Sequence, residues 1–139
     1  MYRALAWLLA LVLVAGCGST STPVTSVGAG SPTPGMAATI SVVDAAVLRD
    51  DGAVIVDVRE PDEWAAGHIP GAILIPLGEL PSRLGDVPPN RPIVVVCRSG
   101  NRSAQGRDIL LGAGFPAVTS LAGGMTDWVN AGMPIETGD

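Results

Sequence analysis

The sequence contains no lysine, one histidine and only two cysteines, and these scarcities exclude several classes of protein. All eight basic residues of the 139-residue chain are arginine, against thirteen Asp and Glu, so the formal net charge is −5. Such an acidic chain lacks the basic face that nucleic acids require, and we expect no nucleic-acid partner. With His68 as its single histidine and no Cys-x-x-Cys pair, it lacks the ligand sets of common metal sites, so we expect no metal ion.

Long apolar runs are also missing. The run from Ala4 to Val14 has eleven residues, whereas a membrane-spanning helix needs about 20. Arg3 precedes this run and the small residues Ala15 and Gly16 follow it, which is the three-part arrangement of a secretory signal. We therefore predict that residues 1–16 are a removable signal peptide and that the protein is exported.

The first cysteine stands directly after the apolar run. The sequence Val14-Ala15-Gly16-Cys17 resembles the lipobox of bacterial lipoproteins. The resemblance implies that Cys17 carries lipid and acyl chains, and that it anchors the protein to a membrane of the cell envelope, at the outer face of the cell membrane or in the periplasm. An ordinary signal peptide is the alternative. With Cys17 lipidated, Cys97 has no partner for the intrachain disulfide that an exported protein would otherwise form.

A stretch of small and turn-forming residues follows Cys17. Fifteen of residues 18–35 are Gly, Ser, Thr or Pro, and none is charged. Such a composition cannot bury enough apolar area to offset the entropy lost on ordering. We predict a flexible tether over residues 17–39 and one globular domain over residues 40–139, because the remaining length suits a single core.

Within this domain, short apolar runs alternate with helix-like segments. Ser41 and Asp44 have the spacing of a capping box, which predicts a helix that ends near Asp50. Strands are expected over residues 54–56, 72–75, 93–96 and 118–121, and further helices over residues 61–67, 78–84, 103–113 and 126–130. Strands without polar alternation that are separated by helices indicate an α/β fold, with a parallel sheet covered on both faces. Ligands of such folds lie beyond the carboxyl ends of the strands, which directs attention to the segment after Val96.

That segment combines a cysteine with the features that stabilise a thiolate. It reads Cys97-Arg98-Ser99-Gly100-Asn101-Arg102-Ser103, a polar loop between a strand end and a helix start. Loop amides, the positive end of the helix dipole and two arginines all favour a negative charge on sulfur, and Gly100 permits a tight turn. We predict that Cys97 has a lowered pKa and acts as a nucleophile; the alternative is a buried, inert cysteine.

At this point the chain resembles a known family. The segment 97–103 is similar to the active-site loop of single-domain rhodaneses, in which six residues run from a cysteine to an arginine that precedes a serine. The resemblance extends over about 100 residues, through the motifs Asp57-Val58-Arg59-Glu60, Glu63-Trp64, Gly67-His68-Ile69-Pro70-Gly71-Ala72 and Gly123-Gly124 with Trp128, Gly132 and Pro134. It implies a five-stranded parallel sheet with helices on both faces, in agreement with the pattern of segments.

The resemblance also implies sulfur transfer without a metal or organic cofactor. The Cys97 thiolate would take the outer sulfur of a small anion such as thiosulfate, hold it as a persulfide and pass it to cyanide, a thiol or a thiol protein. The loop residues would bind the donor, with Arg98 and Arg102 supplying charge; Arg102 could instead point outward and pair with an acidic neighbour. We expect Asp57, Arg59 and His68 to order the loops, and Trp64 and Trp128 to belong to the core.

Two other functions share parts of this pattern. Phosphatases and arsenate reductases of related fold carry a cysteine loop that is longer by one residue, which fits a larger oxyanion. The loop from Cys97 to Arg102 is the shorter form, and it favours a sulfur atom over a phosphate. The other candidate is a sulfur carrier without turnover, or a docking module for another envelope protein.

Overall fold

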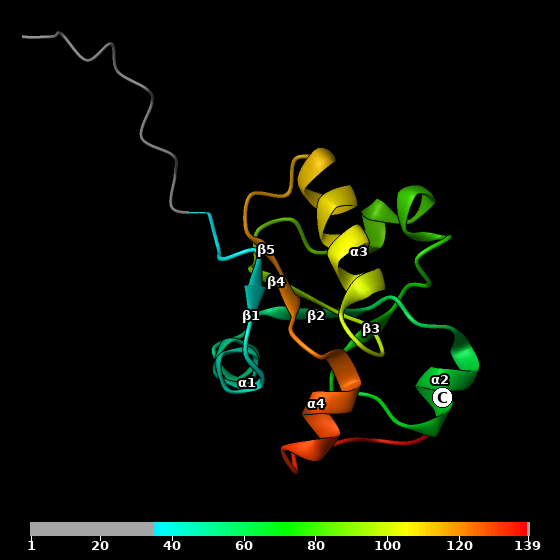
Figure 1. Cartoon of the computed structure of the whole chain (residues 1–139). Helices are drawn as coiled ribbons and strands as arrows, with labels where there is room; N and C mark the ends of the chain where they lie inside the picture. The colour runs from blue at the N-terminus through cyan, green and yellow to red at the C-terminus, as the bar shows by residue number, and fades with distance from the viewer. Residues whose placement is uncertain (1–34, 139) are drawn as a thin grey trace, which may run out of the picture. The chain divides into compact units, whose positions relative to one another are not determined.

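The structure is a computed structural model that describes residues 35–138. The predicted signal peptide (residues 1–16), Cys17 and the first part of the predicted tether lie outside the described residues. Five parallel strands form one sheet in the order β1-β5-β4-β2-β3 (Figure 1). Their bounds are Thr39–Ile40 (β1), Val54–Asp57 (β2), Ile73–Leu74 (β3), Ile93–Val96 (β4) and Val118–Leu121 (β5). The predicted five-stranded parallel sheet is confirmed.

Helices cover both faces of this sheet. They are α1 (Val42–Asp50), α2 (Pro61–Ala66), the 3-10 turns η1 (Leu80–Ser82) and η2 (Leu84–Asp86), α3 (Asn101–Gly112) and α4 (Gly124–Asn130). Helix α3 lies on one side of the sheet, and α1 and α4 lie on the other (Figure 1). Leu110 of α3 and Leu80 of η1 belong to the core on the first face, and Ala45 of α1 and Trp128 of α4 belong to the core on the second. Among residues 35–138, no helix has the length and apolar character needed to cross a membrane.

The central strand β4 shows why the strands lack polar alternation. Ile93 and Val95 belong to the core on the α3 side, whereas Val94 and Val96 belong to the core on the α1 and α4 side. Both faces of the strand are therefore buried, and every position is apolar. On the α3 side, Gly106 brings the helix close, because a Cβ atom there would lie 3.0 Å from Cγ1 of Val95.

Local signals predict the elements well, with some differences. Ser41 caps α1 by accepting a hydrogen bond of 3.2 Å from the Asp44 amide, as the capping spacing predicts. The single helix predicted over residues 78–84 is wrong: the segment forms η1 and η2, with hydrogen bonds between residues three apart, as from Arg83 N to Leu80 O. Pro81 lacks an amide hydrogen, so an α-helical ladder cannot run through it.

The amino-terminal edge of the sheet lies partly inside the predicted tether. Strand β1 pairs with β5, Thr39 opposite Ser120 and Ile40 opposite Leu121. The carbonyl oxygen of Ala38 also accepts a hydrogen bond of 3.1 Å from the Ser120 amide. The ordered contacts of the domain therefore begin before residue 40. A two-residue strand has too few residues to show a period, which is why the sequence pattern does not reveal it.

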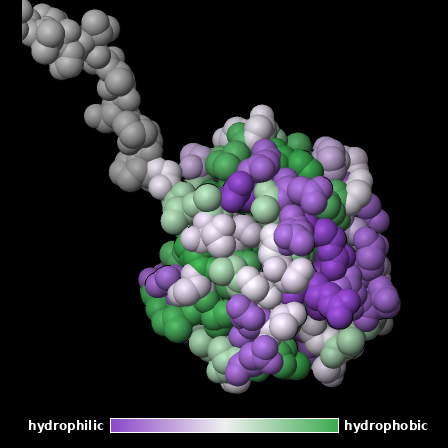
Figure 2. Space-filling model, viewed as in Figure 1, coloured by the Kyte–Doolittle hydropathy of each residue, from purple (hydrophilic) through white to green (hydrophobic). Residues whose placement is uncertain are grey.

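Helices α1 and α2 differ in how hydrophilic the side chains on their surfaces are. Hydrophilic side chains gather over α2, and apolar ones over α1, on the face shown in Figure 2. On α1, Val43 is 65% exposed and Val47 is 55% exposed.

Candidate active site

Cys97 follows β4 at the carboxyl edge of the sheet, and α3 begins four residues later. Its side chain is buried, and its Sγ accepts a hydrogen bond of 3.1 Å from the Gly100 amide. Gly100 has a φ of 105°, a left-handed conformation that glycine adopts without the strain of a side chain. The loop thus folds back over the sulfur and turns amide hydrogens toward it.

Two opposing influences act on the pKa of the Cys97 thiol. Burial is the largest, and it raises the pKa because a thiolate loses hydration. The Ser103 hydroxyl and the amides of Ser103, Gly100 and Ser99 act in the other direction, because they hydrogen-bond the charged form. Together these hydrogen bonds outweigh burial and lower the pKa of Cys97 below its ordinary value. The arrangement can hold a sulfur anion in a nearly dry site.

Helix α4 holds the outer side of the loop. The Met125 amide donates to the Cys97 carbonyl over 2.8 Å, and the Thr126 amide donates to the Arg98 carbonyl over 3.1 Å. With these two carbonyls directed at α4, the following amides are free to face the sulfur. Gly124 makes this approach possible, because a Cβ atom there would overlap the Cys97 carbonyl oxygen and lie 2.7 Å from the Arg98 carbonyl carbon.

The two loop arginines differ in their surroundings. Arg102 forms a bidentate pair with Glu63 of α2, with nitrogen–oxygen distances of 2.7 and 2.8 Å. Hydrogen bonds from Arg102 are the main cause that lowers the pKa of Glu63 to about 2. Arg98 is exposed, and among residues 35–138 no carboxylate pairs with it. Arg102 thus pairs with an acidic neighbour, and its part in binding the donor stays a prediction.

Asp57 and Arg59 form a buried ion pair beneath the loops. The Arg59 Nη2 atom lies 2.7 Å from Asp57 Oδ2, and both side chains are less than a tenth exposed. Arg59 also donates to the carbonyl oxygens of Gly67, over 2.8 Å, and Glu63, over 3.1 Å. The guanidinium thus joins Asp57 of β2 to Glu63 within α2 and to Gly67 after it; the ordering role of the pair stays a prediction.

His68 is buried at the end of α2. Its Nδ1 lies 3.1 Å from the Trp64 carbonyl oxygen and donates to it, because a carbonyl only accepts. The imidazole stacks on the Trp64 ring at 3.6 Å, and its Nε2 lies 3.8 Å from the Glu136 carboxylate. These contacts hold the turn and the C-terminal segment in place. Trp128 is fully buried in the core as expected, whereas Trp64 is only partly buried and packs on His68.

Sequence reasoning missed Ser120. This residue lies on β5, and its hydroxyl oxygen is 2.7 Å from that of Ser103, whose oxygen is in turn 3.5 Å from Cys97 Sγ. All three side chains are buried. Two adjacent polar residues, Thr119 and Ser120, in a strand that is buried on both faces are the signal that could have found it.

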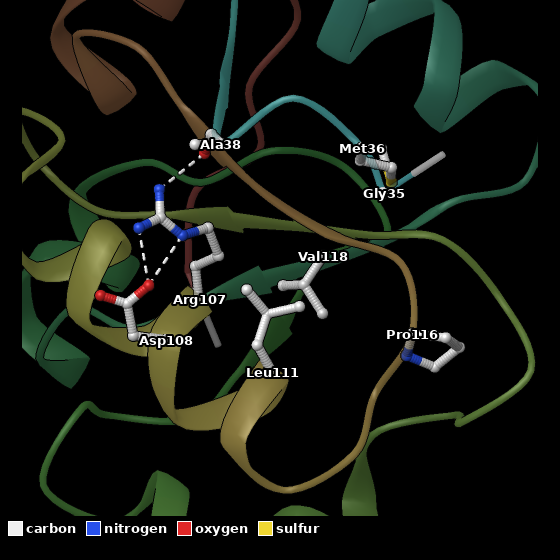
Figure 3. A pocket seen from close by; sticks show the side chains of 8 residues that line it. All are labelled: Gly35, Met36, Ala38, Arg107, Asp108, Leu111, Pro116 and Val118. Carbon is white, nitrogen blue, oxygen red and sulfur yellow. Dashed lines mark hydrogen bonds and ion pairs between the residues drawn. The ribbon is translucent and has the colours of Figure 1, made fainter. Parts of the chain in front are cut away.

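A separate hollow of about 250 Å³ lies near the other end of α3. Figure 3 shows Arg107, Asp108 and Leu111 of α3 beside it, with Arg107 bonded to Asp108 and to the Ala38 carbonyl. Its lining contains no cysteine or histidine, and its one carboxylate, Asp108, is paired with Arg107. The Cys97 loop therefore remains the candidate site.

The chain is similar to known proteins of one family. The family model of the rhodanese-like domain matches residues 41–131. A sulfurtransferase of Allochromatium vinosum is 40% identical over 82 residues, which are 59% of this chain and 77% of that protein. The thiosulfate sulfurtransferase GlpE of Pseudomonas entomophila is 39% identical over 89 residues, which are 64% of this chain and 82% of that protein.

A solved structure shares the same architecture. The crystal structure of a rhodanese-related protein from Thermoplasma volcanium superposes with a TM-score of 0.67. It is 29% identical in sequence, and the match covers 72% of this chain and 98% of the other.

Proposed function

This chain belongs to the rhodanese-like domain family, and we propose that it moves sulfane sulfur from a small anionic donor, such as thiosulfate, to a thiol acceptor through a persulfide on Cys97. The observation that carries the proposal is the environment of Cys97 Sγ, a buried sulfur that accepts hydrogen bonds from loop amides and has a lowered pKa. A thiolate at neutral pH is the nucleophile that sulfur transfer needs.

The first half-reaction forms the persulfide. The Cys97 thiolate attacks the outer sulfur of thiosulfate, the bond between the two sulfur atoms of the donor breaks, and sulfite leaves with the electron pair. The persulfide keeps one negative charge on its terminal sulfur. The loop amides that face Sγ stabilise this charge, as they stabilise the thiolate.

The second half-reaction returns the enzyme. A thiolate of a small thiol or a thiol protein attacks the terminal sulfur and leaves as a persulfide, and Cys97 is again a thiolate. Cyanide does the same in an assay and forms thiocyanate. Neither step needs a metal or an organic cofactor.

Mass spectrometry of the intact protein tests the first step. After exposure to thiosulfate, we expect Cys97 to gain one sulfur atom, and a later addition of dithiothreitol to remove it. The Cys97→Ser variant should gain none, because a hydroxyl is a poor nucleophile and cannot carry a persulfide. If sulfur loads onto Cys97 but does not pass to any thiol, the protein is a sulfur carrier without turnover, and the proposed enzyme activity is wrong.

The same protein tests the phosphatase alternative. The amide of Gly100 already lies 3.1 Å from Sγ, and the loop from Cys97 to Arg102 is one residue shorter than in phosphatases of related fold. We expect no appreciable hydrolysis of a phenyl phosphate. Phosphate release faster than turnover of thiosulfate would overturn the proposed sulfur transfer.

We propose in addition that the protein is exported and is held at a membrane by lipid on Cys17. The apolar run that ends in Val14-Ala15-Gly16-Cys17 supports this proposal. Labelling with a fatty acid should mark the wild-type protein in the membrane fraction and should not mark Cys17→Ser. A mature protein with unmodified Cys17 in the soluble fraction would overturn the anchor, and would leave the chemistry at Cys97 untouched.

A further inference from the structure

Most of the positive charge around the Cys97 loop is cancelled. Arg59 is paired with Asp57 in the interior, and Arg102 is paired with Glu63 through two hydrogen bonds. Arg98, in the same loop, is exposed and carries no ion pair within residues 35–138. A loop that appears doubly cationic in sequence therefore offers an incoming anion about one net positive charge.

We propose that Glu63 is a specificity-determining residue, which cancels the charge of Arg102 and thereby favours singly charged sulfane-sulfur donors over doubly charged ones such as thiosulfate. The proposal rests on the proposed sulfur transfer at Cys97 and names the class of donor for that same site.

The pair is placed where its net charge matters. Arg102 lies on the first turn of α3, directly before Ser103, whose hydroxyl contacts the Cys97 sulfur. Hydrogen bonds to Glu63 are the main cause that raises the pKa of Arg102, and the negative charge of Cys97 raises this pKa as well. The Arg102 guanidinium and the Cys97 sulfur therefore interact electrostatically. An anion that docks on Cys97 is therefore within electrostatic reach of the pair.

The pair is also well placed to persist. Both side chains are about three-quarters buried, with exposed fractions of 30% for Arg102 and 25% for Glu63. The Glu63 Oε2 atom, which accepts from Arg102 Nη1, also accepts a hydrogen bond of 3.2 Å from the Glu60 amide. A bidentate geometry with partial burial is stronger than an ordinary surface ion pair. We therefore expect the cancellation to survive the arrival of a donor.

Two donors that differ by one charge isolate the effect. Thiosulfate is a dianion, and methanethiosulfonate is a monoanion with the same reactive outer sulfur. Attack of the Cys97 thiolate on either outer sulfur forms the same persulfide; the bond to the inner sulfur breaks, and sulfite leaves from one donor and methanesulfinate from the other. Because electrostatic energy is proportional to charge, any change in the charge of the site acts twice as strongly on thiosulfate.

Three variants change this charge in known steps. Glu63→Gln removes the negative charge but keeps an oxygen that accepts from the Glu60 amide. It should raise kcat/KM for thiosulfate about tenfold and for methanethiosulfonate about threefold, as expected for one charge at a partly hydrated site. Arg102→Gln leaves Glu63 uncompensated and should lower kcat/KM about tenfold for thiosulfate and about threefold for methanethiosulfonate. The double variant should return the ratio between the two donors to that of the wild type.

A matched control is available directly before η1. Glu79 pairs with Arg83 at 3.0 Å, in an exposed ion pair that shares no hydrogen bond or ion pair with the loop residues 97–103. Glu79→Gln makes the same chemical change to the net charge of the protein and should leave the donor ratio unchanged. If Glu79→Gln also changes the donor ratio, the effect comes from the overall charge of the protein and the proposal is overturned.

The outcomes separate the two proposals. If Glu63→Gln lowers kcat/KM for both donors alike, the pair only holds the structure and the specificity proposal is wrong. An unchanged donor ratio in both Glu63→Gln and Arg102→Gln would equally overturn it, and if the first variant does not fold the second decides. In either case a persulfide on wild-type Cys97 would leave the proposed sulfur transfer standing. If wild-type Cys97 gains sulfur from neither donor, the proposed function fails and the specificity proposal fails with it.

Discussion

The hydroxyl oxygens of Ser103 and Ser120 lie 2.7 Å apart in the interior, beside the sulfur of Cys97. Ser103 also donates to the Gly100 carbonyl over 2.9 Å, and it lies 3.5 Å from Sγ. A serine has a single hydroxyl proton, so Ser103 cannot donate to both the carbonyl and the sulfur. We expect that, when Cys97 ionises, Ser103 turns its proton to the sulfur and Ser120 donates to Ser103. Ser120 would then support the thiolate without contacting it.

We predict that Ser120→Ala raises the pKa of Cys97. Loss of the hydroxyl leaves Ser103 without its donor when it turns to the sulfur, at a cost of about 1 kcal/mol for one hydrogen bond. The rate of alkylation of Cys97 by iodoacetamide at pH 6 should fall about fivefold, and Ser120→Thr should restore it in part. The pH profile of alkylation is the measurement.

Thr119 provides the control for this variant. It is buried on the same strand, and its hydroxyl donates to the Ala37 carbonyl, 2.6 Å away. Thr119→Val should leave the alkylation profile unchanged even if it lowers stability. A profile that moves equally in both variants would show that general loosening of β5 matters, and not the relay.

Folding should make Cys97 more acidic. Hydrogen bonds to the thiolate lower its pKa from the ordinary value of 9.0, so the thiolate contributes stability that is present above that value and is lost as pH falls through the lower folded value. Alkylation of the native protein should therefore persist to lower pH than alkylation of the urea-unfolded chain. Equal midpoints for the two states would contradict the assignment of the loop as a thiolate site.

The pair of Glu63 with Arg102 predicts a specific loss of stability in acid. The pKa of Glu63 is lowered from 4.5 to about 2, so its contribution is present above pH 4.5 and is lost as pH falls toward 2. Glu63→Gln should lower the free energy of unfolding by about 1 kcal/mol at pH 7 and by much less near pH 2. Urea unfolding at both pH values measures this difference. An equal loss at the two values would mean that packing, and not charge, is removed.

Alanine substitutions at two glycines with positive φ distinguish the effect of backbone strain from the effect of steric overlap. At Gly124 a Cβ atom would overlap the Cys97 carbonyl, whereas at Gly114, with a φ of 92°, nothing lies within 4 Å. Gly114→Ala should cost about 1 kcal/mol and leave persulfide formation intact. Gly124→Ala should cost about 3 kcal/mol or more and abolish it, because the loop must move. Comparable costs in thermal unfolding would show that α4 does not position the loop.

Local sequence signals were sufficient for most elements. Ile93–Val96 reads as a strand because β-branched residues suit an extended chain, and Ser41 reads as a cap because its hydroxyl reaches the amide three residues on. The position of Cys97 after a strand and before a helix follows from the same local patterns. These features involve neighbours within a few residues, so the spacing along the chain is enough to predict them.

The partners of the site residues depend on tertiary structure. Glu63 and Arg102 are 39 positions apart, and they meet only because α2 and the start of α3 lie at the same edge of the sheet. Ser120 reaches Ser103 because α3 packs against β5. Sequence alone determined that a cysteine, two arginines and a serine share one loop between a strand and a helix. The fold decided which of these charges are cancelled and which hydroxyls reach the sulfur, because electrostatic and hydrogen-bonding partners are set by distance in space and not by separation along the chain.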